Sequence, residues 1–212
     1  MLAVRLALLS TVVLAACAGP ATAPLRPDGL VRSDLYVEAP SSAPGMRGAT
    51  TRLYVREVTA PAATGRPVVL FVHGAGTPAE VSFDAPYADY SWMAYLAHAG
   101  FDVFSMDMTG YGRSTRPAAM NDACNVSREQ QAAFVPALIP AHCAPSYPHQ
   151  MTTLASDWHD VDAVVDRIRG LRHVEKLNLV AWSLGGPRSG GYAAQHADKV
   201  AKLVLLAPAY SR

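Results

Sequence analysis

The chain has 212 residues, half of them hydrophobic, with 18 basic and 17 acidic side chains and a formal net charge of +1. This length allows one sizeable core and leaves too little chain for two comfortable domains. A near-neutral charge without a Lys/Arg run gives no electrostatic basis for binding nucleic acid or an anionic membrane surface. We therefore expect no nucleic-acid partner.

The N-terminal residues have the pattern of an export signal. Arg5 and the amino terminus supply positive charge, an apolar run follows as far as Ala16, and Cys17 comes next. The run is too short for an ordinary transmembrane helix, and small residues close it. We predict a signal peptide over residues 1–16.

The four residues that end at Cys17 read Leu-Ala-Ala-Cys and resemble the bacterial lipobox. The resemblance implies acylation of Cys17, a tether over residues 17–32 and attachment to the periplasmic face of a bacterial membrane. Ala18 in place of Asp favours the outer membrane. In this reading the protein reaches a membrane only through its lipid. Ordinary cleavage, giving a secreted or periplasmic protein, and a retained membrane helix are the alternatives.

With Cys17 lipidated, Cys124 and Cys143 remain as an even pair in a compartment that permits oxidation. A disulfide between them and two free thiols are both open, because sequence alone does not place their Cα atoms. The seven histidines are dispersed and no Cys/His spacing resembles a zinc site, so we expect no metal and no other cofactor.

Strands and helices alternate after a short antiparallel pair. Two strands near residues 34–38 and 51–58 show the alternation of an edge pair. The continuously apolar run 67–72 is typical of a strand buried on both faces of a parallel sheet. A helix near 91–99 leads to a second buried strand at 101–107.

The second half of the chain continues the alternation. An amphipathic helix is predicted from Leu154 to a stop at Gly170, followed by a strand at 177–181. A helix rich in small residues runs to about His196, and a last strand spans 202–207. The fold class is α/β, a mostly parallel sheet with helices on both faces and right-handed crossovers.

Residues 115–152 form a long irregular insertion, and loops of this length are usually functional or disordered. Tyr147, Phe134 and Met151 lie in it, on the side where the strand carboxyl ends open. The insertion either walls a substrate pocket, held by a Cys124–Cys143 bridge, or is a surface excursion without substrate contact.

Residues 181–185 read Ala-Trp-Ser-Leu-Gly and resemble the G-x-S-x-G nucleophile elbow of the α/β-hydrolase superfamily, with Ala181 in place of the first glycine. The resemblance implies Ser183 as the nucleophile. Strand and helix approach closely at such a turn, so the flanking residues must be small, as Ala181, Gly185 and Gly186 are. A loop serine among glycines is the alternative, and the position between a buried strand and a helix favours the elbow.

Two further motifs of the same superfamily precede the elbow. His73, Gly74, Ala75 and Gly76 follow an earlier central strand, where this fold places the other half of the oxyanion hole. The resemblance implies that the backbone N–H groups of Ala75 and Leu184 hold the oxyanion. It also implies that His73 shapes this loop and is not the catalytic base.

The second motif, D-x-x-G-x-G-x-S, starts at Asp107 and includes Gly110 and Gly112. Asp107 precedes Ser183, whereas the family order is Ser, then Asp or Glu, then His. We therefore assign Asp107 a structural role in the turn.

The resemblance covers roughly residues 34–212, within a predicted domain of 33–212. It implies a serine hydrolase of the esterase or lipase type. Because no basic or acidic cluster accompanies the motifs, we expect a small ester that is uncharged or apolar. No subfamily follows from these motifs, although a nucleophilic serine disfavours epoxide hydrolases and haloalkane dehalogenases.

His196 is the only histidine after Ser183 in this sequence, and it lies about 20 Å from Ser183 along the predicted helix. The family places its acid and its histidine after later strands, beyond Arg212. We therefore expect the N-terminal portion of a hydrolase, incomplete on its C-terminal side and with little activity of its own. A histidine of the insertion, His142 or His149, is the weaker source of a base. The alternative function is a non-catalytic exported protein that binds a ligand or partner on a degenerate hydrolase fold.

Overall fold

The computed structural model describes residues 28–61 and 64–210. The strands are β1 (Val31–Pro40), β2 (Thr50–Thr59), β3 (Val68–Val72), β4 (Asp102–Met106), β5 (Leu177–Trp182) and β6 (Val200–Leu206). The helices are α1 (Ala79–Phe83), α2 (Trp92–His98), α3 (Arg128–Gln131), α4 (Leu154–Arg172) and α5 (Gly185–Gln195). Short 3-10 turns span Pro44–Met46, Ala118–Asn121 and Ala123–Asn125.

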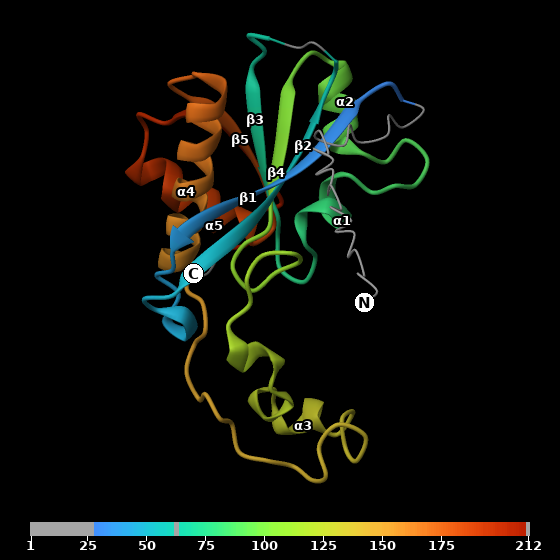
Figure 1. Cartoon of the computed structure of the whole chain (residues 1–212), viewed down its shortest axis with the longest axis vertical. Helices are drawn as coiled ribbons and strands as arrows, with labels where there is room; N and C mark the ends of the chain where they lie inside the picture. The colour runs from blue at the N-terminus through green and yellow to red at the C-terminus, as the bar shows by residue number, and fades with distance from the viewer. Residues whose placement is uncertain (1–27, 62–63, 211–212) are drawn as a thin grey trace, which may run out of the picture.

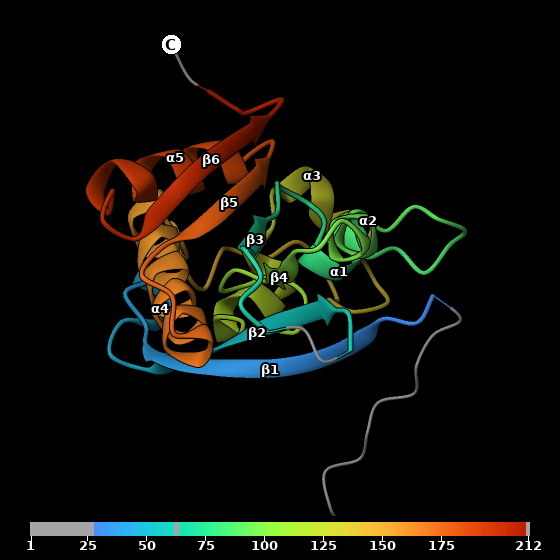
Figure 2. The ribbon, with the colours of Figure 1, turned by 90° about the horizontal axis from the view of Figure 1, so that it is seen from above.

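The six strands form one sheet in the order β1-β2-β4-β3-β5-β6. β1 pairs with β2 and β2 with β4 in antiparallel fashion, while β4, β3, β5 and β6 are parallel neighbours. Helices α4 and α5 cover one face, and α1 and α2 cover the other (Figures 1 and 2). The predicted α/β class and the antiparallel edge pair are confirmed.

Both faces of the sheet are packed. Every residue of β3 and β4 is buried, as a strand covered on two sides requires. On one face Val161, Val165 and Ile168 of α4 join Leu179 of β5, and on the other Phe71 of β3 joins side chains of α1 and α2. Burial of each such side chain contributes roughly 1.5–3 kcal/mol to the free energy of unfolding. This packing holds the strands, and so the strand ends that carry the site.

Helix α4 continues past its predicted stop. It runs through Gly170 to Arg172, and His173 in the left-handed region (φ 53°) closes it. Glycine costs only about 1 kcal/mol inside a helix. The helix continues to Arg172, whose guanidinium pairs with the carboxylates of Glu57 and Asp102 across the sheet.

Strand β1 begins at Val31, within the last two residues of the predicted tether 17–32, and the tether up to residue 27 lies outside the described residues. Arg32 is buried there and donates hydrogen bonds to the carboxylates of Asp28 and Asp84, which hold the start of the strand. Short helix α1 was not predicted. The signal peptide and the acylated Cys17 lie outside the described residues and stay predictions.

No helix of the described segments is both long and apolar enough to cross a membrane.

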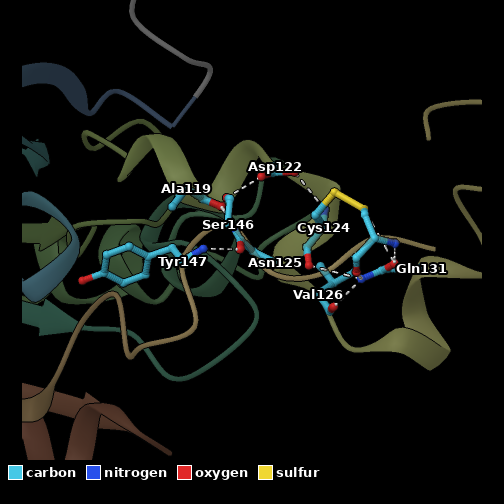
Figure 3. The surroundings of a disulfide bond; sticks show 9 residues. Ala119, Asp122, Cys124, Asn125, Val126, Gln131, Ser146 and Tyr147 are labelled. Atoms are coloured by element: carbon cyan, nitrogen blue, oxygen red, sulfur yellow. Dashed lines mark hydrogen bonds between the residues drawn. A yellow bond between two sulfur atoms is a disulfide. The ribbon is translucent and has the colours of Figure 1, made fainter. Parts of the chain in front are cut away.

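The insertion extends from the end of the sheet where β4 ends (Figure 1). It is not wholly irregular, since it contains two 3-10 turns and α3 with a Ser127–Gln130 capping box. The structure contains the Cys124–Cys143 disulfide (Figure 3). The buried amide of Gln131 donates to the carbonyls of both cysteines and accepts from the Cys143 N–H, so it fills the loop that the bridge closes.

Replacing Cys124 and Cys143 together by serine is expected to lower the free energy of unfolding of the insertion by roughly 3 kcal/mol, because the open loop gains chain entropy on unfolding. Urea unfolding followed by limited proteolysis within residues 115–152 measures this. Reductant serves as the control, since it should weaken the oxidised wild type and leave the double variant unchanged. Equal protease resistance of the two oxidised proteins would contradict the expectation.

Candidate active site

Ser183 lies on a sharp turn between β5 and α5, with φ at 54°. Non-glycine residues rarely adopt this left-handed region, and such strain persists only where the surroundings hold it. Here the Ser183 N–H donates to the Leu206 carbonyl (3.0 Å), and the Ser183 carbonyl accepts from the N–H groups of Gly186 and Ala209 (2.9 Å each). The turn is therefore fixed by backbone hydrogen bonds within α5 and to the end of β6 and the segment after it.

Small residues let the end of β3 meet the start of α5. A Cβ on Gly185 would lie 2.3 Å from the Val72 carbonyl oxygen. A Cβ on Gly74 would lie 2.8 Å from the Ser183 Cβ and 3.3 Å from its Oγ. The structure thus brings the predicted elbow and the His73–Gly76 loop into direct contact.

Two backbone N–H groups adjoin the contact between Gly74 and Ser183 and make no hydrogen bond with any described residue. In residues 28–61 and 64–210, neither the Ala75 N–H nor the Leu184 N–H donates a hydrogen bond. Leu184 is also the N-cap of α5, where the helix dipole concentrates partial positive charge. A hydroxyl flanked by uncommitted donors suits attack on a carbonyl whose oxygen becomes negative.

His73 braces the loop from inside. It is fully buried, its Nε2 accepts from the Met108 N–H (3.2 Å), and the proton on Nδ1 is then donated to the Gly74 carbonyl (2.7 Å). Burial and the nearby Arg188 guanidinium lower the His73 pKa to about 4, so the ring is neutral at pH 7. Both nitrogens are engaged, which leaves neither free to act as a base.

The Asp107 carboxylate has the contacts of a residue that fixes a turn. Its Oδ1 accepts from the Ala79 N–H (2.7 Å) and its Oδ2 from the Arg113 N–H (2.9 Å). Gly112, at φ 46°, passes so close that a Cβ would lie 2.0 Å from the Asp107 Oδ2. Asp107 joins β4 to α1 and makes no hydrogen bond with Ser183.

Sequence reasoning missed a buried polar cluster behind the loop. The Arg188 Nε donates to the Asp157 Oδ2 at 2.7 Å, and the Asp160 Oδ2 accepts from the Thr109 N–H at 2.8 Å. Burial raises the pKa of Asp157, and raises that of Asp160 to about 6. The signal was present, since two aspartates at i and i+3 on the face of α4 that also carries its apolar side chains require partners.

No catalytic base is found within the part of the chain that the structure describes, because no imidazole there hydrogen-bonds Ser183. His196 ends α5 and stacks on Tyr192 with ring centroids 4.6 Å apart. His149 of the insertion lies edge-on to Tyr147 at 5.7 Å.

An apolar hollow of about 320 Å³ opens beside the elbow. Its lining residues are Thr77, Val81, Ser82, Phe83, Trp92, Trp182 and Leu206. Thr77 lies just after the His73–Gly76 loop, the others come from α1, α2, β5 and β6, and none belongs to the insertion. The Met151 carbonyl, at the end of the insertion, accepts a hydrogen bond from the Gly45 N–H (3.0 Å).

Comparison with known proteins gives a family and a set of structural relatives. The family model described as the alpha/beta hydrolase fold matches residues 67–211. No curated protein matches the chain.

Three solved structures share the fold at low sequence identity. A lipase candidate from Sulfolobus solfataricus is 18% identical, with 91% of this chain and 49% of that one covered and a TM-score of 0.58. A CIB-like hydrolase from Thermoplasma acidophilum is 16% identical (86% and 65% covered, TM-score 0.52). A bacterial membrane phospholipase A is 18% identical (87% and 42% covered, TM-score 0.53). The chain therefore spans less than two thirds of the length of each.

Replacing Gly185 by alanine is expected to unfold the elbow or destabilise the protein by several kcal/mol, because the new methyl group would strike the Val72 carbonyl. Gly190→Ala is the matched control on the same helix, since a Cβ there meets nothing within 4 Å. Alanine at 190 should raise stability by up to about 1 kcal/mol. Thermal unfolding of both variants checks this, and equal melting temperatures would contradict it.

Replacing Asp160 by asparagine is expected to change how stability depends on pH. The Asp160 pKa lies at about 6 in the folded protein against 3.8 ordinarily, so the folded state holds an extra proton between these values. As the pH rises from about 4 to about 6, the unfolding free energy of the wild type therefore loses a contribution on the order of 3 kcal/mol. The variant has no such contribution to lose. Urea unfolding at pH 4, 5, 6 and 7 measures the difference, and a gap that does not widen with pH would rule the effect out.

Proposed function

This chain belongs to the alpha/beta hydrolase fold family, and on that premise we propose that it is a serine hydrolase whose nucleophile is Ser183. The observation that carries the proposal is the strained turn at Ser183, with φ at 54° and Gly74 against its side chain. Backbone strain is kept where a hydroxyl must project from between a strand and a helix.

The proposed reaction is acyl transfer to water. The Ser183 Oγ attacks a carbonyl carbon, and the N–H groups of Ala75 and Leu184 hydrogen-bond the oxygen that becomes negative. Collapse of the tetrahedral intermediate breaks the ester C–O bond, the alcohol leaves with the proton that Ser183 gave up, and Ser183 stays acylated. Water then hydrolyses the acyl-enzyme, which releases the carboxylic acid and restores the Ser183 hydroxyl. For this chain we assign the nucleophile and the two donors, and we assign no base and no acid.

The hollow beside Trp182 supports a substrate that is uncharged or apolar. None of its lining side chains carries a formal charge, and Val81, Phe83 and Leu206 supply aliphatic or aromatic surface. Such a pocket binds through burial of apolar area and does not favour an ionised group. We therefore propose a small neutral ester as the substrate class.

Replacing Ser183 by alanine in the full product of this reading frame is expected to abolish covalent labelling by a fluorophosphonate and to reduce ester hydrolysis to background. The reason is that the probe bonds only to an activated, exposed hydroxyl. Mass spectrometry of the labelled peptide measures this. Ser189→Ala is the matched control, because Ser189 lies six positions further along the chain, in α5, and is fully buried.

Failure of the wild type to label, with its fold intact, would overturn the assignment. That outcome would favour a binding protein built on the hydrolase fold.

A further inference from the structure

Arg188 is a buried cation directly behind the His73–Gly76 loop. It lies on α5, five positions after Ser183, and only 2% of it is exposed. Its Nη1 donates to the carbonyl oxygens of His73 (3.0 Å) and Gly74 (3.2 Å). Its Nε donates to the Asp157 carboxylate on α4 at 2.7 Å. The guanidinium therefore links both helices of this face to the loop.

The Gly74 carbonyl receives a second hydrogen bond, from Nδ1 of His73 at 2.7 Å. That carbonyl belongs to the same peptide unit as the Ala75 N–H. A trans peptide is planar, and its C=O and N–H point in opposite directions. Two donors that hold the carbonyl inward therefore hold the Ala75 N–H outward.

We propose that Arg188 is a positioning residue, which fixes the Gly74–Ala75 peptide so that the Ala75 N–H stays aimed at the oxyanion of the reaction at Ser183. This inference rests on the proposed function. A guanidinium suits the task because its planar fork engages several acceptors at once, whereas an ammonium is a point charge. Charge on the carbonyl side also polarises the peptide and strengthens its N–H as a donor.

The surroundings of Arg188 fit this role better than that of a simple stabilising ion pair. Buried ion pairs contribute little net stability, because desolvation offsets their attraction. One oxygen of Asp157 has no hydrogen-bond partner in the described residues, so the geometry of the ion pair is not the one that would stabilise it most. Tyr111 closes the site, with its ring 5.2 Å from the guanidinium and 4.7 Å from the His73 ring.

The test uses the full product of the reading frame and compares Arg188→Met with Arg188→Lys. The methionine variant should label with fluorophosphonate about 10- to 100-fold more slowly, below the roughly 100- to 1,000-fold cost of losing an oxyanion donor outright. For an ester substrate kcat should fall while KM stays nearly unchanged, since the donor acts on the transition state. Lysine should give an intermediate rate.

Amide hydrogen exchange supplies a readout that does not depend on catalysis. Exchange of the segment 73–77 should quicken in Arg188→Met, while exchange in β3 stays as in the wild type. Arg172→Met is the matched control, because Arg172 also spans helix and sheet but pairs with Glu57 and Asp102. That variant should lose stability and keep both kcat and the exchange of the loop.

Wild-type rates and loop exchange in Arg188→Met would overturn the proposal. If that variant does not fold, Arg188→Lys and Asp157→Asn decide, and wild-type labelling by both would overturn it equally. If wild-type Ser183 is not labelled, the serine-hydrolase proposal fails. Loop exchange still decides whether Arg188 holds the peptide.

Discussion

At Gly185 the first turn of α5 lies against the Val72 carbonyl, at a separation that leaves no room for a side chain. β3 and β5 are parallel neighbours, so their carboxyl ends emerge side by side and the segments that follow must share one space. Glycine at 185 and at 74 makes that sharing possible. The turn at Ser183, the two free N–H groups and the start of α5 all take their positions from this contact.

Behind that contact the interior is polar, although an apolar core would cost less desolvation free energy. One guanidinium, two carboxylates and a neutral imidazole are buried together, at Arg188, Asp157, Asp160 and His73. Burial raises the pKa of both carboxylates and lowers that of His73, which means that it disfavours the charged form of each of these three groups. Clusters that sacrifice stability in this way are typical of functional sites, where orientation matters more than burial.

The sequence predicted what local chemistry decides and missed what only the folded chain brings together. The apolar runs at β3 and β4 indicated buried strands, and the resemblance of residues 181–185 to the G-x-S-x-G motif indicated a sharp turn at Ser183. The placement of β4 between β2 and β3 is set by long-range pairing that no window contains. Gly170 looked like a stop because the ion pairs of Arg172, with Glu57 and Asp102, are invisible along the chain. Arg188 was missed for the same reason, since the two carbonyls of the His73–Gly76 loop that accept from it lie more than a hundred positions away.

Both cysteines of the disulfide lie inside the insertion, and so does Gln131, which fills the loop between them. The bridge therefore fixes the shape of this segment without tying it to the sheet. Such a self-contained unit can be exchanged, lengthened or lost during evolution while the strand register beneath it stays the same. Substitutions on the surface of the insertion can thus change what this segment contacts while the buried scaffold stays in place.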